Sequence, residues 1–169
     1  MKSILLFRHG KSNWKAQYND DHDRPLSKRG VKAAKLMGKY VFQIKQVPDK
    51  IISSTALRAK TTAELAVKYG NWNSDFSLDS DIYHCSLETL QTIVANQDPY
   101  INYICLVGHQ PTFSFFLNEI TGENLLAFPT ASMAKINFPI NKWKDIGPRK
   151  GVLSWFKRPR ELMSFKTTI

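Results

Sequence analysis

The feature that most constrains the fold is a run of four apolar residues near the start of the chain, Ile4 to Phe7. A continuous apolar run of this length is typical of a short strand buried on both faces, as in a parallel sheet covered by helices. The run ends on Arg8, His9 and Gly10. Ligands of open α/β sheets bind in the crevice beyond the carboxyl ends of the strands. Taken alone, these three residues fit a basic surface turn equally well, so they do not by themselves predict a ligand site.

Strands and helices alternate along the remainder of the chain. Apolar residues spaced three and four apart predict an amphipathic helix from Val31 to Ile44, with Ser27 as its N-cap. The polar stretch 13–24 is predicted to be a loop, and Gly70 is predicted to end the second helix. Similar patterns predict strands over 50–53, 101–107, 133–138 and 152–156, and helices over 56–69, 87–94 and 111–121. The alternation predicts a three-layer α/β/α sandwich with a mostly parallel central sheet, formed as a single domain over residues 1–169.

The charge and the cysteines narrow the function classes. The net charge of +10 indicates an anionic partner, although a solvated basic face is an equally good reading. None of the sequence signatures of nucleic-acid-binding folds is present. The two cysteines, Cys85 and Cys105, form neither a metal-spaced pair nor a disulfide framework, which favours a reducing compartment. With no signal peptide or apolar stretch of membrane-span length, the sequence predicts a cytoplasmic protein without a membrane partner.

Three strand ends carry groups suited to phosphate. The first strand ends on Arg8 and His9, the second leads into a helix that begins near Arg58, and the strand around 101–107 ends on Gly108 and His109. Parallel strands bring their carboxyl ends to one edge of the sheet. Guanidinium forks suit phosphate oxygens, and a helix N-terminus favours an anion. The sequence therefore predicts a phosphate site built from two guanidiniums and two imidazoles.

These same residues resemble the signature blocks of a known family. The segments 7–12, 53–59 and 107–109 are similar to the three blocks of the histidine phosphatase superfamily, which has the phosphoglycerate-mutase-like fold. Segments 23–30, 57–64, 128–130 and 158–162 resemble its short branch, the SixA-type phosphohistidine phosphatases. The resemblance covers essentially the whole chain in order, with no large lid insertion between the blocks.

The resemblance implies roles for individual residues. His9 is expected to be the nucleophile that becomes a transient phosphohistidine. Arg8, Arg58 and His109 are expected to hold the phosphoryl oxygens, and Ser12 matches a family position whose hydroxyl helps to bind phosphate. No metal and no cofactor are implied. The expected activity is removal of phosphate from phosphohistidine on a protein, with a small-molecule phosphomonoesterase as the alternative. A basic phosphate- or nucleic-acid-binding module with a degenerate site is the alternative from another class.

The sequence differs from the larger members of the family at the acid that protonates the leaving group. Those enzymes place a Glu or Asp to protonate the leaving group, but no residue in the segment 78–85 matches that motif cleanly. Asp81 is the candidate general acid, and an aspartate that merely forms a turn is the alternative interpretation. A phosphoramidate such as phosphohistidine leaves as a nitrogen that can already carry a proton. The weak match therefore favours N–P substrates over alkyl phosphate esters.

Overall fold

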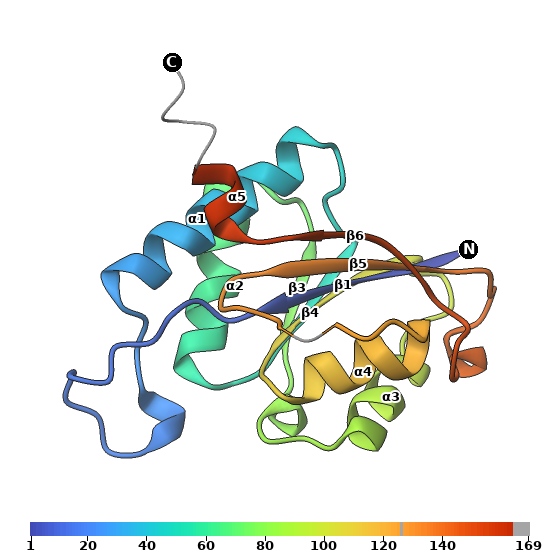
Figure 1. Ribbon diagram of the computed structural model, residues 1–169, viewed down its shortest axis with the longest axis horizontal. Coiled ribbons are helices and arrows are strands. Elements are labelled where there is room, and N and C mark those ends of the chain that lie inside the picture. Colours follow the sequence, from blue (N-terminus) through green and yellow to red (C-terminus); the bar gives the residue numbers. More distant parts are fainter. Residues whose placement is uncertain (126, 164–169) are drawn as a thin grey trace.

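The computed structural model of the protein describes residues 1–125 and 127–163, and Figure 1 shows its layered arrangement. The strands are β1 (Lys2–Arg8), β2 (Lys50–Ser53), β3 (Asp75–Leu78), β4 (Tyr103–Gly108), β5 (Met133–Phe138) and β6 (Val152–Lys157). The helices are α1 (Lys28–Gln43), α2 (Leu57–Gly70), α3 (Leu87–Ala95), α4 (Thr112–Thr121) and α5 (Pro159–Met163). Three short 3-10 helices lie at Asp21–Asp23, Ser80–Ile82 and Trp143–Asp145.

Within the described residues the strands form one sheet in the order β3-β2-β4-β1-β5-β6. The pairs β2–β3, β2–β4 and β1–β4 are parallel, whereas β1–β5 and β5–β6 are antiparallel. The predicted mostly parallel sheet is confirmed. In β1, Arg8 lies beside Gly108 of β4, and Ser53 of β2 lies beside Val107. The three strand ends that carry Arg8, Ser53 and Gly108 therefore meet at one edge.

Helices cover both faces of the sheet, so the three-layer prediction is confirmed (Figure 1). Alternate residues of β1 point to opposite faces, as the strand period requires. Leu5 and Phe7 pack with buried residues of α1 and α2, and Ile4 and Leu6 pack with buried residues of α3 and α4. Because both faces are buried, β1 can be apolar throughout its centre. Among the described residues no helix is long and apolar enough to cross a membrane.

Two glycines bring the loop after β1 against the first turn of α1. A Cβ on Gly30 would lie 2.2 Å from the carbonyl oxygen of Lys11, and one on Gly10 would lie 2.8 Å from that of Gly30. Side chains at these positions would push the loop away from the helix. The Gly10 N–H also donates to Thr62 Oγ1 at 2.9 Å, and this hydroxyl donates to the carbonyl of Arg58 at 2.7 Å. The loop that follows His9 is thus held between α1 and α2.

Several boundaries differ from the expectations. The second helix runs through Gly70, and Asn71 in the left-handed conformation ends it, with φ 51°. Asparagine tolerates this conformation because its short polar side chain can bond locally. The stretch 13–24 is not wholly irregular, because Asp20 accepts the N–H of His22 and starts a 3-10 helix there. Ser27, by contrast, caps α1 as predicted by accepting the N–H of Gly30.

Candidate active site

His9 lies directly after β1, and its side chain is buried. Its Nδ1 lies 2.7 Å from the carbonyl oxygen of Gly10. A carbonyl oxygen only accepts, so Nδ1 carries the proton and Nε2 of the neutral ring keeps its lone pair. Burial, together with the charges of Arg8, Arg58 and Arg24, lowers the pKa of His9 to about 4. The ring is therefore neutral at pH 7, with one nitrogen available as a nucleophile.

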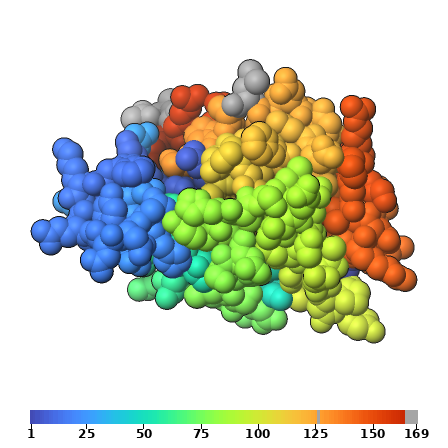
Figure 2. Space-filling model, turned by 90° about the horizontal axis from the view of Figure 1, so that it is seen from below, coloured from blue at the N-terminus to red at the C-terminus, as the bar shows by residue number. Residues whose placement is uncertain are grey.

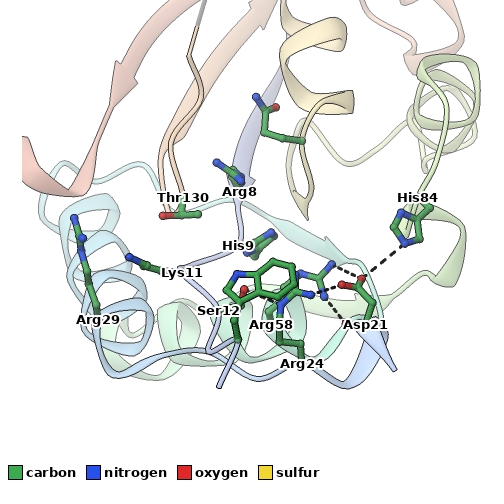
Figure 3. Close-up of a pocket in the computed structure, with 12 residues that line it drawn as sticks. Arg8, His9, Lys11, Ser12, Asp21, Arg24, Arg29, Arg58, His84 and Thr130 are labelled. Atoms are coloured by element: carbon green, nitrogen blue, oxygen red, sulfur yellow. Dashed lines mark hydrogen bonds and ion pairs between the residues drawn. The ribbon is translucent and has the colours of Figure 1, made fainter. Parts of the chain in front are cut away.

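The half-buried guanidinium of Arg8 and the buried guanidinium of Arg58 lie in the same pocket as His9 (Figure 3). Arg8 Nη1 donates to the carbonyl of Phe128 at 2.9 Å, which holds this side chain at the end of β1. Arg58 belongs to the first turn of α2, as the sequence predicts, and its side chain is only 5% exposed. The Nε atoms of both arginines are buried without a hydrogen-bond partner among the described residues. Donors of this kind are suited to an anion.

His109 follows β4 and lies beside His9. The two ring centroids are 5.3 Å apart. The Nε2 atom of His109 lies 2.8 Å from Ser54 Oγ, and that hydroxyl in turn accepts the N–H of Ala56. Burial and the neighbouring His9 and Arg58 lower the pKa of His109 to about 3. His109 therefore contributes a neutral ring rather than a further positive charge.

Ser12 also lies in the pocket, where Arg24 fixes its hydroxyl. Arg24 Nε donates to Ser12 Oγ at 2.9 Å, so the Ser12 hydroxyl proton can point to a ligand. Arg24 is 5% exposed, and its guanidinium lies 3.6 Å from the ring centroid of Trp14. The indole covers the outer side of this cation. Arg24 is therefore a third arginine of the pocket, which the sequence did not mark as a site residue.

Asp21 connects the arginines to the opposite wall of the pocket. Its carboxylate accepts hydrogen bonds from Arg24 Nη1, from Arg58 Nη2 at 3.0 Å and from the hydroxyl of Tyr83 at 2.6 Å. Its backbone carbonyl accepts a further bond from Arg58 Nη1 at 2.7 Å. The bond from Tyr83, together with those from the arginines, holds the pKa of Asp21 well below its usual range. Asp21 is thus ionised at neutral pH and orients both guanidiniums.

The wall next to Asp21 comes from the segment between β3 and α3. Figure 2 shows the blue segment that follows β1 next to the green segment in this region. The Tyr83 ring packs against His22 and His109, with centroids 5.0 and 5.6 Å away. His84 Nε2 lies 3.8 Å from Asp21 Oδ2, and its ring lines the pocket (Figure 3). Tyr83 and His84 are two further residues that the sequence did not single out.

Together these groups enclose a cavity of about 600 Å³ at the carboxyl edge of the sheet. Its lining residues are Arg8, His9, Lys11, Ser12, Trp14, Asp21, Arg24, Arg29, Arg58, His84, Gln110 and Thr130. Five of these are arginines or lysines, and Asp21 is the one carboxylate among them. The cavity can hold a dianion such as a phosphoryl group next to a neutral, nucleophilic His9.

Asp81 does not belong to this cavity. It lies in the 3-10 helix Ser80–Ile82, where its backbone N–H donates to the side chain of Asp79 at 2.9 Å. Its exposed side chain lines a different hollow, together with Ser86 and Glu88 of the region around α3. The structure therefore brings together Arg8, His9, Ser12, Arg58 and His109, and leaves the expected acid candidate outside.

Among the described residues, one group of side chains has metal-ligand spacing. The ligand atoms of Asp20, His22 and Asp23 lie within 4.8 Å of one another on the loop after β1. Two of the three are engaged elsewhere, because Asp20 accepts the N–H of His22 and His22 Nε2 lies 2.8 Å from Thr55 Oγ1. These bonds hold the loop that carries Asp21, and they explain why the three side chains lie close together.

The protonation of His9 can be measured directly. Long-range ¹H–¹⁵N NMR is expected to show a neutral ring protonated at Nδ1 at pH 6, titrating near pH 4. An unfolded chain binds that proton near pH 6.5. The unfolded state therefore binds more protons between these values, so this group lowers the stability as the pH falls from about 7 to 4. Titration of His9 near pH 6.5 would contradict an environment in which the ring is buried and surrounded by positive charges.

Comparisons with known proteins find one family model and several similar proteins. The family model described as "Histidine phosphatase superfamily (branch 1)" matches residues 4–82. An uncharacterized protein of Mycobacterium leprae is 26% identical over 90% of this chain and 99% of its own length. The crystal structure of a protein assigned as the phosphohistidine phosphatase SixA of Agrobacterium tumefaciens superposes with a TM-score of 0.81, at 27% identity over 94% of this chain and 98% of that chain. The structure of the protein histidine phosphatase SixA complexed with tungstate gives 0.81 at 21% identity, covering 95% and 99%, and shares the fold.

Proposed function

The chain belongs to the histidine phosphatase superfamily, and we propose that it removes phosphoryl groups from phosphohistidine on a protein through a covalent intermediate on His9. The observation that carries this proposal is the hydrogen bond from His9 Nδ1 to the Gly10 carbonyl, inside a pocket with three buried or half-buried arginines. That bond leaves Nε2 as the free nucleophile beside groups that bind phosphate oxygens. The similarity to a SixA-type structure supports the same assignment.

The proposed reaction has two steps. In the first, the Nε2 lone pair of His9 forms a bond to phosphorus while the bond from phosphorus to the substrate nitrogen breaks. Arg8, Arg58, His109 and the Ser12 hydroxyl hold the equatorial oxygens, and the two arginines offset their charge. In the second step, water attacks phosphorus, the bond to His9 breaks, and inorganic phosphate leaves. We propose that these side chains supply the positive charge that a metal ion supplies in other phosphatases.

The ionised state of the carboxylate in the pocket is an argument for substrates whose leaving group is a nitrogen. Asp21 is held ionised by its bonds to Tyr83, Arg24 and Arg58, so it is a poor proton donor at neutral pH. An alkoxide leaving group needs a proton in the transition state. A p-nitrophenolate departs without one, and a histidine nitrogen can already carry one. A pocket rich in arginine and poor in acids therefore favours phosphoramidates.

We also propose that the protein acts in the cytoplasm. Its two cysteines are free, as is typical of a reducing compartment.

A series of leaving groups tests the substrate class. Wild-type protein is expected to hydrolyse a phosphohistidine-containing protein and p-nitrophenyl phosphate without added metal, at least about 10²-fold faster than sugar phosphates or 3-phosphoglycerate. Asp81→Asn is expected to change all of these rates by the same small factor, because Asp81 lies outside the cavity. A steep loss in Asp81→Asn that is confined to alkyl phosphates would restore Asp81 as the acid.

A small-molecule phosphomonoesterase is the second candidate, and the position of His84 favours it. This side chain lines the cavity on the side away from Lys11 and Arg29, 3.8 Å from Asp21 (Figure 3). An imidazole N–H there would donate to a leaving oxygen. Under this second function, wild-type protein hydrolyses alkyl phosphates well, and His84→Gln reduces that rate far more than the rate on p-nitrophenyl phosphate. Equal effects on both substrates would leave the phosphohistidine assignment in first place.

A further inference from the structure

A second cavity, of about 390 Å³, adjoins the one that holds His9. The two share Lys11, Arg29 and Thr130 in their linings, so they lie side by side. The second cavity lies between the start of α1, the segment before β5 and the short helix α5. In Figure 3, Lys11 and Arg29 lie on the opposite side of His9 from Asp21 and His84. A substrate held at His9 can extend in this direction.

The charged groups of this second cavity are all cationic. Among the described residues that line it, Lys11, Arg29, Arg158 and Arg160 carry positive charge and none carries negative charge. The positive charge of Arg158 is partly compensated, because its Nε donates to Glu161 Oε1 at 3.0 Å. Lys11, Arg29 and Arg160 are exposed. The cavity therefore presents cations that are open to an anionic ligand.

The remaining lining is largely apolar. It consists of Ala33, Ala127, Pro129, Pro159 and Met163 together with the hydroxyl-bearing Thr130. A free phosphate or a small sugar phosphate would leave this floor without a complementary surface. A peptide segment places acidic side chains next to methylene and methyl groups, so it complements both the cations and the floor. The shape and charge fit a polypeptide better than a small polar molecule.

We propose that the second cavity binds an acidic segment of the substrate protein, next to the phosphohistidine that reacts at His9. This assignment rests on the proposed function, because it needs the phosphoryl group to be seated in the first cavity. Glutamate or aspartate side chains of the substrate pair with Arg160, Arg29 and Lys11, and an apolar side chain lies on the floor. The basic residues near the end of the chain then select which phosphohistidine proteins are hydrolysed.

Two synthetic phosphohistidine peptides test the proposal, one with glutamates and one with glutamines flanking the reactive residue. Phosphate release is followed by ³¹P NMR at about 0.15 M salt, where distant charges are screened. Wild-type kcat/KM is expected to be at least about fivefold higher for the glutamate peptide. Arg160→Glu is expected to remove this preference, while p-nitrophenyl phosphate hydrolysis stays within about twofold of wild type, because Arg160 does not line the first cavity.

A matched control is available at the opposite edge of the sheet. Lys142 is exposed and follows β5, whose end at Phe138 pairs with Lys2 at the start of β1. Lys142→Glu makes the same change in net charge and is expected to keep the full preference for the glutamate peptide. A loss of preference equal to that of Arg160→Glu would show a general charge effect and overturn the site.

The outcomes separate this inference from the function on which it rests. Equal hydrolysis of the two peptides by wild-type protein would overturn the acidic subsite while leaving the phosphohistidine activity intact. Hydrolysis of p-nitrophenyl phosphate alone, with neither peptide cleaved, would overturn the proposed function. Inhibition by a small bisphosphate that Arg160→Glu abolishes, without any preference between the peptides, would assign the cavity to a small ligand and overturn the peptide assignment.

Discussion

Replacement of His9 by alanine is expected to lower kcat by at least about 10³-fold on every substrate, because no covalent intermediate can form without Nε2. The variant should remain folded. The alanine removes one hydrogen bond, from Nδ1 to Gly10, and the loop is still held by the bond from Gly10 N–H to Thr62. Steady-state kinetics, together with thermal unfolding followed by circular dichroism, measures both effects.

Phosphate binding provides the control for His9→Ala. Since the imidazole is neutral at pH 7, its removal takes no positive charge from the pocket. Inorganic phosphate is therefore expected to bind the folded variant within about threefold of the wild-type Kd, as measured by calorimetry. A folded His9→Ala variant that still turns over p-nitrophenyl phosphate at an appreciable rate would remove His9 from the chemistry.

Arg58→Lys is expected to lower kcat/KM by at least about tenfold, roughly 1.4 kcal/mol of transition-state stabilisation. Arg58 uses two nitrogens to hold Asp21, through Nη1 to its carbonyl and Nη2 to its carboxylate, and its buried Nε has no hydrogen-bond partner among the described residues. A lysine ammonium is a single point of charge that cannot keep this planar set of donors. The loss should appear with phosphohistidine and p-nitrophenyl phosphate alike.

Arg149→Lys is the matched control for that substitution. Arg149 is exposed and lies in the connection between β5 and β6, where its N–H donates to the carbonyl of Glu119. The same change of side chain at this position is expected to leave kcat/KM within about twofold of wild type. Near-normal kinetics in Arg58→Lys would place Arg58 outside the reacting geometry.

The sequence predicts the fold and the centre of the site well, because both depend on buried strands. Apolar runs mark the strands, and the polar residue that follows each run must lie at a sheet edge. Arg8 ends β1, His9 and His109 directly follow strands, and Arg58 lies in the first turn of the next helix. The sheet order and register then bring these positions together, as expected from parallel pairing.

The rest of the site depends on loops, where the sequence has no comparable periodicity. Asp21 and Arg24 come from a polar stretch in which three aspartates are equivalent by composition. Only the 3-10 helix at Asp21–Asp23 decides which carboxylate reaches Arg58. The similarity of segment 23–30 to the family could have marked Arg24 as a site residue.

The same limitation explains the position of Asp81 relative to its neighbours. Asp79, Asp81 and His84 lie within six residues of one another, and the sequence offers no reason to prefer one of them. The turn that Asp79 starts directs Asp81 away from the cavity, and it brings His84 to the cavity and Tyr83 to Asp21. The segment has no periodicity, so the sequence does not show which of these side chains faces the cavity.

The central claim is that His9 carries the phosphoryl group between the two steps. Rapid quenching of wild-type protein with ³²P-labelled substrate, followed by peptide mapping, measures this directly. The label is expected on His9, stable in base and lost in acid, as a phosphoramidate requires. Label found instead on Ser12 or Cys105, or an acid-stable phosphoryl group, would contradict the account.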